Sequence, residues 1–197
     1  SFPTRRSSDL HTILNNASLV VPDGAGILWA AERQGEHVPE RVTGVDVTKR
    51  LFKVAAERQI PVYCLGAAPG VAQRAIDNLS AQVGPLNIAG IHDGFFDSTE
   101  EQEIVKAISE SKAKLVFVAL GVPKQEQWIS EKLSHLDGVV AIGIGGSFDV
   151  LAGNIPRAPE WMQQNRLEWL YRLYLEPQRI GRMLAIPKFM WTVIRNK

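Results

Sequence analysis

The sequence predicts an α/β fold: a Rossmann-like, mostly parallel sheet with helices on both faces, followed by a C-terminal helical appendage. Short apolar runs alternate with amphipathic stretches of helix length, which is typical of a doubly wound sheet. The apolar runs are continuous, as in strands that are buried on both faces. After Gly153 this alternation stops and the remaining residues have helical spacing, which indicates the appendage.

Length and composition restrict the class of protein. The chain has 197 residues, 45% of them hydrophobic, with 22 Lys and Arg against 21 Asp and Glu. This composition excludes a disordered, collagen-like or disulfide-rich chain. Cys64 is the only cysteine, so no intrachain disulfide can form and a reducing compartment is expected. No apolar run approaches the roughly 18 residues that span a bilayer, so we expect a soluble or at most peripheral protein.

The first predicted elements precede the main series of strands. Ser18–Val21 is predicted to be a strand, and the turn Pro22-Asp23-Gly24 leads from it into a helix over Ile27–Arg33. A second helix is predicted over Gly44–Gln59, because apolar side chains recur there at helical spacing.

Two strand–helix pairs follow. The apolar run Pro61–Leu65 predicts a buried strand, and Pro69–Val83 predicts the helix behind it. Leu86–Ile91 predicts the next strand, and Thr99–Ser111 the next helix. Ser98 or Thr99, followed by acidic residues, predicts a capping box at the start of that helix.

The clearest strand in the sequence is Leu115–Leu120. Gly121-Val122-Pro123 then begins a predicted helix that runs to about His135, with Pro123 at its first position, and Val139–Ile144 is the last predicted strand. Ligands of such sheets bind at the carboxyl ends of the strands. Five loops are therefore candidates for the site: 22–26, 66–70, 92–97, 121–126 and 145–150.

The appendage differs from the rest of the chain in charge. Pro159–Leu175 is helical in pattern, and Pro177 and Pro187 are predicted to divide the remainder into short helical pieces. From Arg157 to Lys197 eight Lys and Arg stand against three acidic residues, a net charge of +5, whereas the rest of the chain carries −4. Trp161, Trp169 and Trp191 lie in the same segment. A basic, aromatic tail on an acidic body suggests a polyanionic surface as partner.

Several chemistries are excluded by the residues. The loop Gly66–Gly70 lacks the lysine and spacing of a P-loop, and Gly143–Gly146 lacks the surroundings of a dinucleotide loop. Asp149 stands where a nucleophile elbow requires glycine. The four histidines have no metal-ligand spacing, and no Asp-x-Asp pair is present to bind a cation on a diphosphate.

Three features could carry chemistry, each with a simpler alternative. Asp23 could act as a general base beside a strand end, but Pro-Asp-Gly is a common turn and Asp also caps helices; the residues alone favour the turn. Arg41 could bind a phosphate or sugar, although a solvated loop charge is commoner. Lys124 and Gln125, in the first turn of a helix, could bind an anion or sugar, or merely begin that helix.

Residues 1–10, Ser-Phe-Pro-Thr-Arg-Arg-Ser-Ser-Asp-Leu, resemble the in-frame translation of a sequencing-library adapter. We therefore expect these residues to be foreign to the natural protein, the alternative being an ordinary polar arm. The expected organisation is then a foreign segment over 1–10, a Rossmann-like core over 11–153 that is incomplete at its N-terminus, and the appendage over 154–197.

From His11 to about Lys197 the sequence resembles the WecG/TagA/CpsF glycosyltransferases of bacterial cell-surface polymer synthesis. Any one of the shared motifs is weak, but the ordered set is specific. The motifs are Ala17–Gly26, Arg41–Asp46, Gly121–Glu126, Gly143–Asp149, Gly153, Arg157–Pro159, and Leu167–Arg172 continuing through Glu176–Arg179 to Arg182.

The resemblance implies transfer of an N-acetylmannosamine-type sugar from a UDP donor to undecaprenyl-diphosphate-linked N-acetylglucosamine, as in wall teichoic acid or enterobacterial common antigen assembly. It implies an inverting reaction without metal or cofactor, by an enzyme that is cytoplasmic and peripheral on the inner leaflet of the cytoplasmic membrane. A nucleic-acid partner is not expected, and the oligomeric state stays open.

The same resemblance implies the roles of individual residues. Asp23 matches the proposed base, and Arg41 and Gln125 match residues that line the cleft. We extend the substrate-binding set to Lys124 and to the last strand–helix loop, with Gly145, Gly146, Ser147 and Asp149. The arginines that match those associated with activity at the membrane, or with the lipid diphosphate, are Arg172, Arg179 and Arg182.

One departure from the family pattern bears on activity. The family has earlier strands and a Thr-x-Asn motif before the segment that matches Asn15–Val21, and this sequence has neither. The fragment could therefore be impaired. The alternatives are a non-catalytic nucleotide-sugar-binding module and an NAD-type oxidoreductase, the latter disfavoured by the loops.

Overall fold

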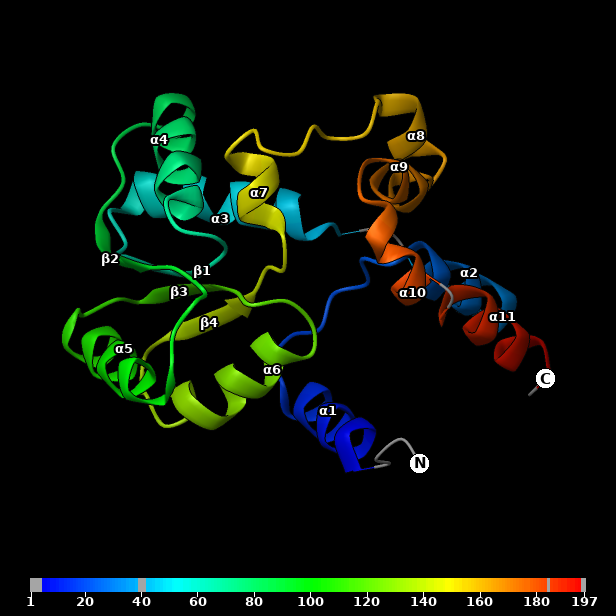
Figure 1. Cartoon of the computed structure of the whole chain (residues 1–197), viewed down its shortest axis with the longest axis horizontal. Helices are drawn as coiled ribbons and strands as arrows, with labels where there is room; N and C mark the ends of the chain where they lie inside the picture. The colour runs from blue at the N-terminus through cyan, green and yellow to red at the C-terminus, as the bar shows by residue number, and fades with distance from the viewer. Residues whose placement is uncertain (1–4, 39–41, 184, 196–197) are drawn as a thin grey trace. The chain divides into compact units, whose positions relative to one another are not determined.

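The computed structural model describes residues 5–38, 42–183 and 185–195 (Figure 1). The chain divides into two compact units. The first consists of Ser1–Val20 and Gly44–Ile155, and the second of Val21–Thr43 and Pro156–Lys197. The second unit thus contains, besides most of the predicted appendage, residues 21–43, which the sequence analysis assigned to the core.

A parallel four-stranded sheet forms the centre of the first unit. Its strands are β1 (Val62–Gly66), β2 (Ile88–His92), β3 (Leu115–Ala119) and β4 (Val140–Gly143), in the order β2-β1-β3-β4. All three pairings are parallel. The chain order changes direction between β1 and β3, which is where ligands bind in open sheets of this kind. The predicted α/β class is confirmed.

Helices cover both faces of this sheet, as predicted (Figure 1). On one face α3 (Gly44–Arg58), α4 (Val71–Val83) and α7 (Ser147–Leu151) pack on the side chains of Cys64 and Phe117. On the other face α5 (Ser98–Glu110), α6 (Lys124–Trp128) and the π-helix η1 (Ile129–Leu133) pack on the alternate side chains of β1 and β3. Every residue of β1 and β3 is buried, which explains their continuous apolar sequence.

The predicted strand Ser18–Val21 is wrong. Residues 18–21 follow α1 (Arg5–Asn16) in an irregular, exposed conformation, and the side chain of Leu19 is 79% exposed. A strand is stabilised by hydrogen bonds to a neighbouring strand, and the sheet found in the described residues contains no strand that pairs with this segment. The other four predicted strands are confirmed to within about two residues.

A capping box begins α5, as predicted, but the predicted N-cap residues Ser98 and Thr99 are wrong, because the box is formed by Asp97 and Glu100. The Asp97 carboxylate accepts hydrogen bonds from the N–H groups of Thr99 and Glu100, at 2.8 and 2.9 Å, and Glu100 Oε2 accepts one from the Asp97 N–H, at 3.0 Å. The hydrogen bonds from Glu100 and Thr99 lower the pKa of Asp97.

Two predicted helices differ from the observed ones in the middle. The helix predicted over residues 121–135 begins at Lys124, with Pro123 as its N-cap, and changes to π geometry at Ile129. The helix predicted over Pro159–Leu175 is two helices, α8 (Glu160–Gln164) and α9 (Glu168–Leu175), because Arg166 adopts a φ of 61° between them. A left-handed residue of this kind ends a helix.

The second unit is built from helices in its described residues. Besides α8 and α9 it contains α2 (Ala25–Arg33), the 3₁₀ turn η2 (Pro177–Arg179), α10 (Ile180–Met183) and α11 (Ala185–Arg195). Pro187 lies near the start of α11 and does not divide the segment, because the N–H groups of a first helical turn need no partner within the helix.

An ion pair joins two distant segments of the second unit. Arg166 donates to Glu32 Oε1 at 2.7 Å, which ties the turn between α8 and α9 to α2. The hydrogen bond from Arg166 lowers the pKa of Glu32.

We expect Phe117→Ala to lower the free energy of unfolding of the first unit by about 3–5 kcal/mol. Phe117 lies in the central strand, is fully buried and stacks on Phe52 of α3 at a ring-centroid distance of 4.5 Å. Urea unfolding measures the change. The thiol of Cys64 offers a second probe, because burial raises its pKa and should prevent alkylation until this core opens.

The matched control is Phe95→Ala, because the side chain of Phe95 is 73% exposed. This variant should unfold at the same urea concentration as the wild type. Equal stability of Phe117→Ala and the wild type would contradict the assignment of the core.

Candidate active site at the carboxyl edge of the sheet

Parallel strands bring the loops that follow them to one edge of the sheet. The loops after β1, β2, β3 and β4 are four of the five that the sequence singled out, and all lie in the first unit. Gly66, at the end of β1, permits a close approach to β3: a Cβ there would lie 2.5 Å from the carbonyl oxygen of Ala119. The fifth loop, 22–26, belongs to the second unit.

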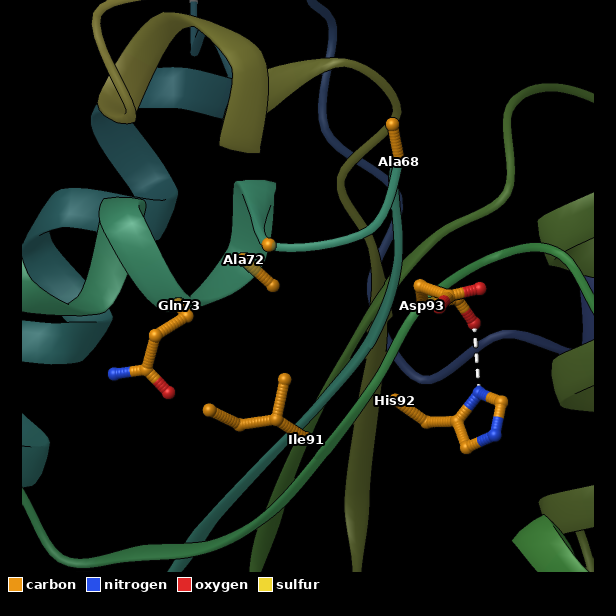
Figure 2. Close-up of a pocket in the computed structure, with 7 residues that line it drawn as sticks. Ala68, Ala72, Gln73, Ile91, His92 and Asp93 are labelled. Atoms are coloured by element: carbon orange, nitrogen blue, oxygen red, sulfur yellow. Dashed lines mark hydrogen bonds between the residues drawn. The ribbon is translucent and has the colours of Figure 1, made fainter.

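A cavity of about 250 Å³ opens at the ends of β1 and β2 (Figure 2). One wall comes from the segment that enters α4, and the other from the end of β2. Figure 2 shows the side chain of His92 turned away from Gln73, with its Nδ1 2.9 Å from the carbonyl oxygen of Asp93. The lining residues are Ala68, Gly70, Ala72, Gln73, Ile91, His92 and Asp93.

The first turn of α4 forms part of this cavity wall. The helix has 13 residues and begins after Gly70, whose φ of 76° is accessible to glycine at no cost. Its N-cap is a glycine and so supplies no capping side chain. Backbone N–H groups at a helix start attract anions. The sequence predicted this loop as a candidate but none of its residues as ligands. A strand that ends at a glycine and is followed directly by a helix is the pattern that could have identified them.

The side chain of Gln125 is buried and acts as a strut, a support for the turn after β4. Its side chain is only 3% exposed, and its Oε1 accepts a hydrogen bond from the N–H of Gly145 at 2.9 Å. Its Nε2 donates to Glu126 Oε1 at 2.8 Å. The carboxamide also packs on Gly143, where a Cβ would lie 2.6 Å from Nε2. Gln125 therefore stabilises the turn after β4 through its hydrogen bond with Gly145 and its packing on Gly143.

That turn holds the other predicted residues of the last loop. Gly145 has a φ of 54°, Gly146 is the N-cap of α7, and the buried Ser147 donates its hydroxyl hydrogen to the carbonyl oxygen of Ile144 at 2.6 Å. Asp149 lies in α7, and its backbone carbonyl oxygen accepts a hydrogen bond from the N–H of Asn154 at 2.9 Å. The structure thus brings Gln125, Gly145, Gly146 and Ser147 together.

Lys124 points toward a different loop. Its Nζ lies 5.0 Å from the centre of the Phe96 ring, in the connection between β2 and α5. This cation–π contact leaves the ammonium at the carboxyl edge, between the loops after β2 and β3.

Two polar contacts of the Glu101 carboxylate form a brace that holds α6 in place. This brace was not predicted from the sequence. The indole Nε1 of Trp128, which is 4% exposed, donates to Glu101 Oε1 at 2.9 Å. The other carboxylate oxygen of Glu101 binds Lys132 Nζ at 2.7 Å. The hydrogen bond to Glu101 raises the pKa of Lys132. Because the partners are 27 to 31 positions apart, no local pattern could have identified this brace.

The other predicted site residues belong to the second unit. Asp23 is exposed and precedes Gly24, the N-cap of α2. Arg41 lies outside the described residues. Arg172 is partly buried and pairs with Glu176 at 3.3 Å, while Arg179 and Arg182 lie in η2 and α10.

Within the described residues no group of three or more His, Cys, Asp and Glu side chains could hold a metal ion.

The whole chain is similar to known glycosyltransferases. Residues 2–197 match the family described as Glycosyl transferase WecG/TagA/CpsF family. An N-acetylglucosaminyldiphosphoundecaprenol N-acetyl-beta-D-mannosaminyltransferase of Bacillus subtilis (strain 168) is 35% identical over 197 residues, which are 100% of this chain and 76% of that protein.

Two further relatives have the same name. The protein of Bacillus spizizenii (strain ATCC 23059 / NRRL B-14472 / W23) is 34% identical over 196 residues, 100% of this chain and 76% of that protein. The protein of Staphylococcus aureus (strain NCTC 8325 / PS 47) is 34% identical over 185 residues, 94% of this chain and 72% of its own. These relatives favour neither the oxidoreductase nor the non-catalytic alternative.

We expect Gly143→Ala to displace the Gln125 carboxamide, because the new methyl group would occupy its place. The hydrogen bond from Gly145 should then weaken, and the free energy of unfolding should fall by about 1–3 kcal/mol, as in other overpacked sites. Hydrogen exchange at the Gly145 amide, followed by NMR, and urea unfolding measure the two effects.

Gly181→Ala is the control, because a Cβ at Gly181 meets no atom within 4 Å. Hydrogen exchange at the Gly145 amide as slow in Gly143→Ala as in the wild type would contradict the role of Gln125 as a strut.

Proposed function

The chain belongs to the WecG/TagA/CpsF family of glycosyltransferases, and from this membership we propose its reaction. It transfers an N-acetylmannosamine-type sugar from a UDP donor to undecaprenyl-diphosphate-linked N-acetylglucosamine, in the synthesis of a bacterial cell-surface polymer such as wall teichoic acid. The observation that carries this proposal is the similarity of the full chain to relatives named for that transfer.

The donor nucleotide is proposed to bind at the carboxyl edge of the sheet. Two features of the first unit support this position. The cavity beside α4 combines small residues with the start of a long helix, which suits an anionic group. The Gly145–Ser147 segment of the turn presents backbone without bulky side chains, and Gln125 holds it through the hydrogen bond to the Gly145 N–H.

The proposed reaction inverts the anomeric carbon in one displacement. The acceptor hydroxyl oxygen forms a bond to that carbon while the bond from the carbon to the UDP oxygen breaks, and UDP leaves with the electron pair. The carboxylate of Asp23 takes the hydroxyl proton as general base. The exposure of Asp23 to solvent, in the loop before α2, supports this role.

Negative charge that develops on the departing diphosphate must be stabilised without a metal in this proposal. Lys124, Arg41 and the N–H groups of the Gly145–Gly146 turn are the proposed donors, together with an arginine of the second unit. Gln125 contributes indirectly, since its buried amide holds the turn. Asp149 is proposed to contact the donor from α7.

We expect Asp23→Asn to reduce sugar transfer by about 10²–10⁴-fold, the usual contribution of a general base, with little change in the affinity for UDP. Release of UDP in the presence of a lipid-linked acceptor measures the transfer, and isothermal titration measures the affinity.

The matched control is Asp137→Asn, which removes an exposed carboxylate from the loop before β4. Wild-type transfer by Asp23→Asn would exclude Asp23 as the base. Failure of the unaltered protein to bind UDP or to transfer the sugar would contradict the proposed function itself.

The second unit is proposed to bring the enzyme to the inner leaflet of the cytoplasmic membrane, where the lipid-linked acceptor lies. None of the helices in the described ranges is both long and apolar enough to span a bilayer. Aromatic side chains are exposed on this unit, with Trp161 at 59%, Tyr174 at 80% and Trp191 at 60%, and such side chains suit the headgroup region. The net charge of +5 over residues 157–197 favours an anionic leaflet.

We expect reversal of Arg172, Arg179 and Arg182 to glutamate to weaken binding to phosphatidylglycerol vesicles at least tenfold, since each basic residue near such a surface contributes about 1 kcal/mol. Vesicle sedimentation measures the bound fraction, and neutral phosphatidylcholine vesicles show how much of it depends on charge.

A control with the same change in net charge reverses Arg50, Lys53 and Arg58 of α3, in the first unit. This control should bind vesicles better than the appendage variant does. Unchanged sedimentation of the appendage variant would contradict the docking role.

A further inference from the structure

Glu126 has an unusual environment for a carboxylate. Its Oε1 accepts the hydrogen bond from Gln125 Nε2, at 2.8 Å. Its Oε2 is buried and has no hydrogen-bond partner among the residues that the structure describes. A buried, unpartnered oxygen of this kind costs stability, and native proteins keep few of them, so its retention requires an explanation.

We infer that Glu126 is a positioning residue that fixes the orientation of the Gln125 carboxamide and, through it, the conformation of the Gly143–Ser147 turn. The inference rests on the proposed function, in which that turn contacts the donor. Glu126 itself touches neither substrate nor reacting atoms in this account.

The two ends of the Gln125 carboxamide differ in what they can bind, because the oxygen accepts hydrogen bonds and the nitrogen donates them. A glutamine side chain can rotate by half a turn and exchange its oxygen and nitrogen at nearly equal volume. The Gly145 N–H can only donate, so it binds Gln125 only when Oε1 faces it. The opposite orientation would place two donors against each other and release the turn.

An ionised carboxylate at position 126 removes this ambiguity, because it can only accept a hydrogen bond. It binds Nε2 of Gln125 and thereby directs Oε1 toward Gly145. A neutral amide or hydroxyl at the same position could bind either end of the carboxamide. The negative charge is therefore what selects the orientation, and the hydrogen bond to it is also stronger than one to a neutral group.

The fold of α6 does not depend on Glu126. Trp128 is buried and bonded to Glu101, and Glu101 also binds Lys132 of the π-helix. These contacts anchor the helix without involving Glu126. Loss of the Glu126 carboxylate should therefore disturb the Gln125 side chain and the turn without unfolding the element that carries them.

A double-mutant cycle tests the inference. In the otherwise unaltered protein, Glu126→Ala should lower kcat/KM for the UDP-sugar by about tenfold or more, the loss of one charge-assisted hydrogen bond, and Glu126→Gln should lower it less. In the Gln125→Ala background neither substitution should have an effect beyond about twofold, because the group through which Glu126 acts is gone.

NMR gives a readout that does not depend on activity. In Glu126→Ala the side-chain NH₂ signals of Gln125 should move to the range of a free amide, and the Gly145 backbone amide should exchange faster. Glu131→Ala, which removes an exposed carboxylate of η1, is the control and should leave both signals unchanged.

Three results would overturn the inference: unaltered Gln125 and Gly145 signals in Glu126→Ala, wild-type kcat/KM in that variant, or the same loss of kcat/KM with and without Gln125. Should the unaltered protein transfer no sugar, the proposed function fails, and the NMR signals still decide whether Glu126 orients Gln125.

Discussion

The parallel pairing of β1 with β3 is the constraint on which the first unit depends. Both strands are buried on both faces, and their alternate side chains belong to two separate hydrophobic clusters. In this pairing Gly66 lies opposite Ala119, so that both strands end at the same level. The loops that follow must then meet at one edge. The position of any ligand site built from these loops is therefore set by the hydrophobic packing of the two strands.

The chemistry of this edge is arranged by polar side chains that are themselves buried. Gln125 supports the turn after β4, and the Glu101 carboxylate anchors the helix that carries Gln125. Buried polar groups with defined partners have few alternative arrangements, so they hold backbone donors in place before a ligand arrives. Such preorganisation is what stabilisation of a leaving diphosphate requires, because the donors then need no rearrangement during the reaction.

The proposed reaction divides its tasks between the two units. Nucleotide binding is assigned to the first unit, with its glycine-rich turns and the start of α4. The proposed base Asp23 and the arginines proposed to meet a lipid diphosphate belong to the second unit, whose exposed aromatic residues and positive charge suit an anionic surface. This proposed division is consistent with an acceptor that remains in the membrane and a donor that is soluble.

Much of the fold could be predicted from the sequence alone. The four strands, the helices between them and the helical appendage follow from local hydrophobic patterns, and the parallel topology follows from their alternation. The candidate loops followed from the same topology. The local pattern singled out Asp23 and Gln125 but left a simpler alternative for each, and the resemblance to the family implied their roles.

Only the tertiary structure decided the features that depend on distant neighbours. Ser18–Val21 has the composition of a strand but no strand in the described structure to pair with. Gln125 lies in the predicted first turn of a helix, yet it is buried, and Gly143 leaves room for its carboxamide. Trp128 finds Glu101 across 27 positions. Local sequence sets what each segment can form, whereas burial and hydrogen-bond partners are set by whichever segments the fold brings beside it.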